Sequence, residues 1–131
     1  MRRRTWGLAV WGALLMASAI VEAAGHIDTA TKFLTAWGRE DWEELATVAA
    51  PKVVVRVDGK ESVLDVTAKK TDVALVLPFK GLSTIRTGET VSGVTVDDIT
   101  VKVRGEEKKG KGTLTLEESG GKFSVVKVAI Q

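Results

Sequence analysis

The chain has 131 residues and a formal net charge of +2, and it contains no cysteine. This length suffices for one domain with a sizeable hydrophobic core. The absence of cysteine excludes disulfides, thiol catalysis, a lipoprotein anchor and cysteine-ligated metals.

The N-terminal segment has the pattern of a signal peptide. Arginines at residues 2–4 precede an uncharged apolar run over residues 6–21. Val21 and Ala23 stand at the small-residue spacing that signal peptidases recognise, with Ala24 as an alternative last residue. The alternative is an uncleaved membrane anchor, but a spanning helix needs about 20 apolar residues and this run is shorter. We therefore expect cleavage.

Cleavage changes the charge of the protein. Loss of the three arginines and Glu22 lowers the formal net charge from +2 to zero. The remaining chain then has no excess of cations, whereas nucleic-acid binding needs a clustered cationic surface. We expect residues 1–23 to be a signal peptide and residues 24–131 to form a single domain. The mature protein is then secreted or periplasmic, has no nucleic-acid partner, and meets the membrane only through the transient signal peptide.

Two helices are predicted at the start of this domain. Asp41 begins the second helix, because its carboxylate can accept from free backbone N–H groups, and Glu44 completes a capping-box pattern. Gly38 is the expected end of the first helix and Pro51 of the second. The predicted buried positions are Ile27, Ala30, Phe33, Leu34 and Trp37 in the first helix, and Trp42, Leu45, Ala46 and Ala49 in the second.

Residues 53–57 are rich in valine and predict a strand, followed by a turn at Asp58-Gly59. Two interpretations of the next segment stay open. Lys60 to Val66 could pair back as a hairpin strand, or Glu61 to Lys70 could form a third helix. We favour the helix, whose inward residues would be Val63, Leu64 and Ala68.

The segment after residue 70 is predicted to be extended. Val73 to Leu77 is a compact apolar run that suits a buried strand. Pro78 and the glycine at position 81 are expected to interrupt it, and Leu82 to Arg86 resumes extended structure.

From Val94 onward the pattern is that of antiparallel strands. Ile99, Val101 and Val103 alternate with polar residues, and Leu114 and Leu116 do the same. Turns are expected at Asp97-Asp98, over Gly105 to Gly110 and over Ser119 to Gly121. A change of parity near Val126-Lys127 predicts a bulge. Helices followed by such strands indicate an α+β domain with helices on one face of the sheet.

Four segments carry a resemblance to a known family. They are FLTAW at residues 33–37, DWEELATVAAP at 41–51, VVVRVDGK at 53–60 and GKFSVVKV at 121–128. Their order and hydrophobic pattern resemble the nuclear transport factor 2-like superfamily, also called ketosteroid isomerase-like or SnoaL-like. The resemblance implies a cone-like curved antiparallel sheet wrapped around two or three N-terminal helices, with an apolar pocket at the wide end. Members often dimerise through the sheet, and they include both enzymes and non-catalytic binding or assembly domains.

The side chains that enzymatic members of this family use are mostly missing. The chain has no tyrosine to serve as an oxyanion donor. Its one histidine, His26, lies just after the expected cleavage site and is predicted to be solvated. Asp65 and Asp72 could reach the mouth of a pocket as acid–base candidates. We predict no catalytic residue, no metal site and no cofactor.

Apolar and aromatic residues are the candidates for ligand contact. The predicted pocket residues are Phe33, Trp37, Trp42, Phe79 and Leu82. The alternative is that the tryptophans only pack the helices against the sheet. We favour a non-catalytic domain that binds a small apolar ligand or a protein partner and can form a homodimer through its sheet. The alternative function is an isomerase, dehydratase or hydrolase that uses a pocket carboxylate.

Overall fold

The computed structural model describes residues 25–131, so the predicted signal peptide lies outside the described residues. This part of the chain folds as two helices followed by seven strands. Residues 25–39 are helical. The elements that follow are α2 Trp42–Val48, β1 Ala49–Val57, β2 Lys60–Asp65, β3 Lys70–Thr71, β4 Val73–Thr87, β5 Thr90–Val103, β6 Glu106–Ser119 and β7 Lys122–Ile130. Within residues 25–131 no helix has the length and hydrophobicity needed to cross a membrane.

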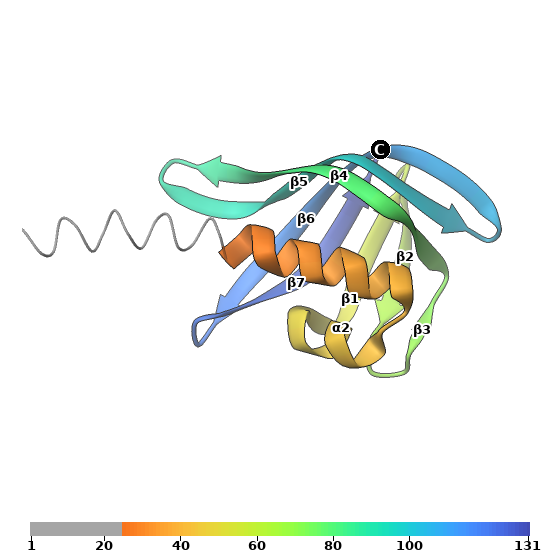
Figure 1. Cartoon of the computed structure of the whole chain (residues 1–131), viewed down its shortest axis with the longest axis horizontal. Helices are drawn as coiled ribbons and strands as arrows, with labels where there is room; N and C mark the ends of the chain where they lie inside the picture. The colour runs from red at the N-terminus through yellow and green to blue at the C-terminus, as the bar shows by residue number, and fades with distance from the viewer. Residues whose placement is uncertain (1–24) are drawn as a thin grey trace, which may run out of the picture.

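The strands form one curved sheet in the order β3-β2-β1-β7-β6-β5-β4. All neighbouring strands are antiparallel except β1 and β7, which are parallel. Figure 1 shows the sheet curving around the helices, which lie on its concave side. The predicted cone-like α+β architecture is therefore confirmed, with one parallel pair at the centre of the sheet.

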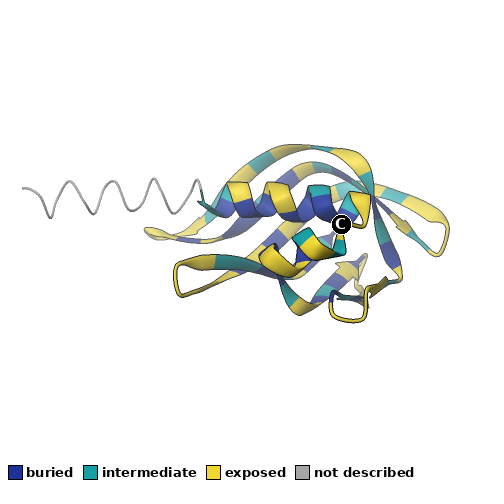
Figure 2. Cartoon of the chain, turned by 60° about the horizontal axis from the view of Figure 1, so that its bottom comes forward, coloured by how far each residue is buried: buried dark blue, intermediate teal, exposed yellow. Residues whose placement is uncertain are grey.

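The helix over residues 25–39 presents one buried stripe to the sheet, visible as dark blue segments in Figure 2. Four of the five predicted core positions are fully buried and Ile27 is half-buried, which confirms the predicted face. Gly38 is not the end of the helix, because the chain turns only at Glu40, whose φ is 54°. Gly38 instead permits close packing, since a Cβ there would lie 2.5 Å from Cγ of Leu77.

His26 is buried, with 3% of its surface exposed, and the prediction of a solvated histidine is wrong. The helix already includes residue 26, and this position falls on the same stripe as Ala30 and Phe33 at helical spacing. The imidazole ring packs against Phe123 of β7, with ring centroids 4.3 Å apart. The prediction relied on the closeness of His26 to the expected cleavage site. The burial of this residue follows instead from its spacing along the helix.

The second helix begins as predicted. The Asp41 carboxylate accepts a hydrogen bond from the backbone N–H of Glu44 at 3.2 Å. The buried stripe is partly wrong, because Ala46 is exposed and the inward residues are Leu45 and Val48. The helix also ends at Val48, before the predicted proline stop.

Pro51 lies inside β1, where the pairing with β7 is irregular between Ala49 and Val54. A proline lacks an N–H donor and is tolerated at such an irregularity. Ala49 already has extended dihedral angles of −134° and 155°, so the helix is left two residues before the proline.

The N-cap gives a first prediction. We expect Asp41→Ala to lower the free energy of unfolding by about 1 kcal/mol, because it removes the hydrogen bond to the N–H of Glu44. Urea unfolding followed by circular dichroism measures this loss. Glu43→Ala is the control, since it removes a carboxylate from the same turn without removing the cap. Equal stability of the two variants would contradict the capping role.

Residues 60–65 form a strand, so the helix that we favoured over Glu61 to Lys70 is wrong. Asp58 and Gly59 both have positive φ, 49° and 82°, which is the geometry of a two-residue hairpin turn. Strand β2 pairs with β1 through this turn. Leu64 is buried, whereas Val63 is 45% exposed on the outer face opposite Val54. The Asp-Gly turn therefore favours the hairpin strand over the helix in this segment.

Two predicted interruptions lie inside long strands. Strand β4 continues past Pro78 and Gly81, with irregular pairing to β5 between Val76 and Lys80. Since β4 is an edge strand, the missing N–H of the proline is tolerated. Asp97-Asp98 likewise lies within β5, at a break in register with β6.

The C-terminal strands agree closely with the prediction. Thr115 pairs with Lys127, and the next residue, Leu116, pairs with Val125. Val126 is therefore the extra residue of a bulge, and the predicted change of parity is confirmed. The predicted turn over Gly105 to Gly110 is shorter than expected, because β6 already begins at Glu106.

Candidate functional site

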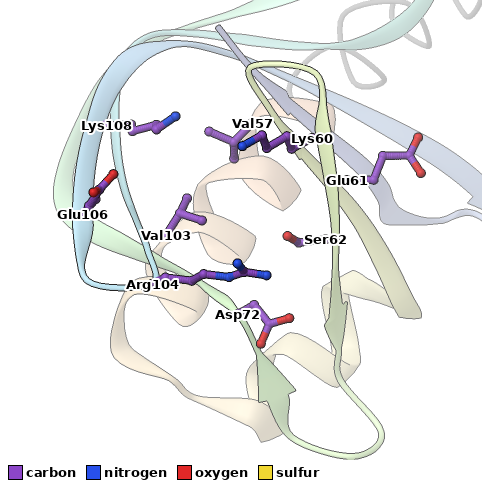
Figure 3. Close-up of a pocket in the computed structure, with 9 residues that line it drawn as sticks. All are labelled: Val57, Lys60, Glu61, Ser62, Asp72, Val103, Arg104, Glu106 and Lys108. Carbon is purple, nitrogen blue, oxygen red and sulfur yellow. The ribbon is translucent and has the colours of Figure 1, made fainter.

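A cavity of about 350 Å³ lies between the β1–β2 hairpin and the β5–β6 hairpin (Figure 3). The end of β3 and the start of β4 contribute a third wall through Asp72. Residues from three separate connections therefore meet in one place. The lining residues are Val57, Lys60, Glu61, Ser62, Asp72, Val103, Arg104, Glu106 and Lys108.

Two tight turns position the hairpin walls of this cavity. Asp58-Gly59 joins β1 to β2, and Arg104-Gly105 joins β5 to β6 with φ angles of 52° and 86°. Both turns need two residues with positive φ, for which Asp-Gly is a favoured sequence. Arginine is not favoured at such a position, since the left-handed conformation of a side-chain-bearing residue costs about 1 kcal/mol or more.

Two of the charged lining residues, Glu61 and Lys108, form ion pairs with residues outside the lining. Lys108 Nζ lies 3.1 Å from Asp58 Oδ2 and so connects the two hairpins. Arg56 pairs with Glu61, and Figure 3 shows the Glu61 carboxylate directed away from the other lining residues. Both pairs are substantially exposed, so each contributes at most about 1 kcal/mol to stability.

Four charged residues of the lining make no ion pair with another residue of the described chain: Lys60, Asp72, Arg104 and Glu106. In Figure 3 the Arg104 guanidinium extends into the cavity toward Ser62 and Asp72. The walls thus offer two cations, two carboxylates and one hydroxyl. Val57, which is buried, and Val103, which is half-buried, add an apolar surface.

The five predicted pocket residues lie elsewhere. Phe33 and Trp37 are fully buried in the core with ring centroids 5.8 Å apart, and Trp37 Nε1 donates to the carbonyl of Val73 at 3.0 Å. Trp42, Phe79 and Leu82 are half-buried and pack against that core. None of the five lines the cavity of Figure 3. Their contact with a ligand stays a prediction.

The two predicted carboxylates have different positions. Asp72 lines the cavity between the two hairpins, which is not the apolar pocket whose mouth it was predicted to reach. Asp65 instead closes a turn, because its Oδ1 accepts from the N–H of Ala68 at 2.9 Å. No cluster of three His, Cys, Asp or Glu side chains suited to a metal ion occurs among residues 25–131.

Sequence reasoning missed the basic residues of the site. Lys108 lies in the segment from Gly105 to Gly110 that was predicted as a turn, and no local pattern marks Lys60 or Arg104 as functional. The available signal was the Arg-Gly pair between two alternating strands, which marks a turn with an unusual first residue. The meeting of the two hairpins depends on the curvature of the sheet, and no local pattern specifies it.

Comparisons with known proteins give similarity only at the level of structure. The sequence matches no protein-family model, and no curated protein sequence matches it. An NTF2-like protein from Cytophaga hutchinsonii superposes with a TM-score of 0.52 and 15% identity, covering 79% of this chain and 91% of that protein.

Two further solved structures superpose slightly better. The CaMKII hub of S. rosetta has a TM-score of 0.56 and 14% identity, covering 83% of this chain and 95% of the hub. An LEH-like epoxide hydrolase of M. tuberculosis has a TM-score of 0.55 and 13% identity, covering 84% of this chain and 81% of the enzyme. At sequence identities this low, the similarity supports a shared fold and gives no information about activity. The two helices, the curved sheet and these superpositions together show that the chain has the nuclear transport factor 2-like fold.

Proposed function

We propose that this chain is an exported, non-catalytic binding domain, and that the cavity between its two hairpins holds a small molecule. The observation that carries the proposal is the set of charged residues that line the cavity without ion-pair partners in the described chain. Such groups are suited to hydrogen bonding with a polar ligand. Six of the nine lining residues are charged, so a polar ligand fits this cavity better than the apolar ligand expected from the sequence.

An enzyme that uses Asp72 is the second candidate, because this carboxylate lines the cavity. Carboxylates that transfer protons are usually shielded from water in their active sites. Every aspartate and glutamate of residues 25–131 is exposed or half-buried. This exposure favours the binding function over the enzymatic one.

Mass spectrometry of the protein purified from its own host tests the binding function. We expect a mass surplus under native conditions that disappears on denaturation. Ser62→Phe should lose the surplus, because residue 62 lines the cavity, whereas Ser83→Phe on the exposed part of β4 should retain it. A bare protein mass in native spectra would contradict a tightly held ligand.

Export and assembly are tested by the same spectra. If residues 1–23 are a signal peptide, the denatured mass will correspond to a chain that begins at Ala24. A homodimer through the sheet would appear in the native spectra as twice the mass of this chain. The outer face offers Val54 and the 45%-exposed Val63 for such a contact. A bare dimer would favour an assembly module over a ligand-binding domain.

A further inference from the structure

We infer that the ligand of this cavity is a zwitterion with a small aliphatic part, of the chemical class of a free α-amino acid. This inference rests on the proposed function, since it specifies which small molecule the cavity holds. It follows from the signs, positions and partners of the lining side chains, taken together with the apolar surface between them.

The lining has equal numbers of positive and negative side chains that make no ion pair within the described chain. Glu61 is engaged by Arg56 and is directed outward, and Lys108 is engaged by Asp58. Two cations and two carboxylates remain without an ion-pair partner in the described chain: Lys60, Arg104, Asp72 and Glu106. All four side chains are exposed, and the two signs are present in equal number, so a ligand with only one charge would meet two groups of its own sign. A ligand that carries both charges complements the whole set.

The second step is the position of Arg104. Its backbone adopts a φ of 52°, in a turn where glycine, asparagine or aspartate is favoured. The turn directs the guanidinium into the cavity toward Ser62 and Asp72 (Figure 3). A guanidinium is the side chain best suited to pair with a planar carboxylate through two parallel hydrogen bonds. We therefore assign the ligand carboxylate to Arg104 and the ligand ammonium to Asp72 or Glu106.

The third step is the size and the apolar surface of the cavity. Its volume of about 350 Å³ is near the lower end of the range for ligand pockets, about 300–1,000 Å³. Val57 and Val103 are the apolar residues of the lining. This surface is suited to a short aliphatic side chain and has no aromatic residue for ring stacking.

Three probes with the same side chain but different charges distinguish a zwitterionic ligand from an anionic or a cationic one. Binding of L-leucine, N-acetyl-L-leucine and L-leucinamide is measured by isothermal titration calorimetry at about pH 6.5, where α-amino groups with pKa values of about 7.7–8 are protonated. Leucine carries both charges, the N-acetyl derivative only the negative one, and the amide only the positive one. We expect leucine to bind at least about tenfold more tightly than either derivative, as one charge-assisted hydrogen bond predicts.

Two variants test the assignment of each ligand group. Arg104→Gln should weaken the binding of leucine and N-acetylleucine about tenfold and leave leucinamide unchanged. The double variant Asp72→Asn/Glu106→Gln should weaken the binding of leucine and leucinamide and leave that of N-acetylleucine unchanged. Arg86→Gln and Asp97→Asn are matched controls on exposed residues outside the cavity, and both should bind like the original protein. Thermal melts followed by circular dichroism show that each variant is folded.

Equal binding of leucine and one of its derivatives overturns the inference, and so does the absence of binding by all three. These failures differ from failure of the proposed function. A mass surplus in native spectra together with no binding of the three probes would retain a ligand-binding domain and reject the zwitterion. A bare native mass together with no binding would reject both.

Discussion

Replacing Trp37 by alanine is expected to lower the free energy of unfolding by about 3–5 kcal/mol. Trp37 is 1% exposed at the centre of the core, where it packs at 5.8 Å from the ring of Phe33. Its truncation removes a large apolar surface and leaves a cavity that the surrounding strands can fill only in part. It also removes one of the two side-chain hydrogen bonds that the carbonyl of Val73 accepts, the other coming from Oγ1 of Thr71 at 2.7 Å.

Two further substitutions separate these contributions. Trp37→Phe keeps an aromatic ring but removes Nε1, so it should lose less than the alanine variant. Trp42→Ala removes a half-buried tryptophan of the neighbouring helix and should also cost less. Urea unfolding followed by circular dichroism gives the three values. A loss at position 42 that equals or exceeds the loss at position 37 would contradict the central role of Trp37.

The elements that the sequence predicts well are those with a long and consistent hydrophobic period. The buried stripe of the first helix and the alternation of Ile99, Val101 and Leu114 along the last strands needed no tertiary information. The bulge at Val126 was predictable for the same reason, because a change of parity can be accommodated only by an extra residue. Local period and local turn chemistry agree in these segments.

The errors come from segments where two local signals compete. Residues 61–70 contain apolar residues that fit a helix and also follow an Asp-Gly turn that fits a hairpin. The turn prevailed, because β2 completes its backbone hydrogen bonds by pairing with β1. His26 is a similar case, in which the position near an expected cleavage site was given more weight than helical spacing.

The candidate site was harder to predict than the fold, because its residues come from distant parts of the sequence. Asp58 and Lys108 are separated by 50 positions and meet only because the curved sheet brings the two hairpins together. The predicted aromatic residues belong to the core instead, since burial of large apolar surfaces is what stabilises a domain of this size. Polar residues from separate hairpin walls, which hydrophobic patterns do not detect, line the cavity.

The second large effect is expected at a glycine inside the sheet, where β5 and β6 approach closely. Gly93→Ala is expected to lower the free energy of unfolding by about 3 kcal/mol. A Cβ at this position would lie 2.4 Å from the backbone oxygen of Leu114, which is closer than real Cβ contacts allow. The obstacle is a main-chain carbonyl of β6 and cannot rotate away, so β5 and β6 would have to separate near the pair between Gly93 and Thr115.

Gly88→Ala provides the matched comparison, because it adds the same methyl group in the β4–β5 turn. Gly88 has a φ of 66° and no atom within 4 Å of a Cβ built there, so alanine should cost only the backbone strain of about 1 kcal/mol. Chemical unfolding of both variants measures the difference between a steric clash inside the sheet and an unfavourable turn conformation. If Gly93→Ala is no less stable than Gly88→Ala, β5 and β6 can separate locally at little cost. In that case close approach of these two strands at Gly93 does not require a glycine.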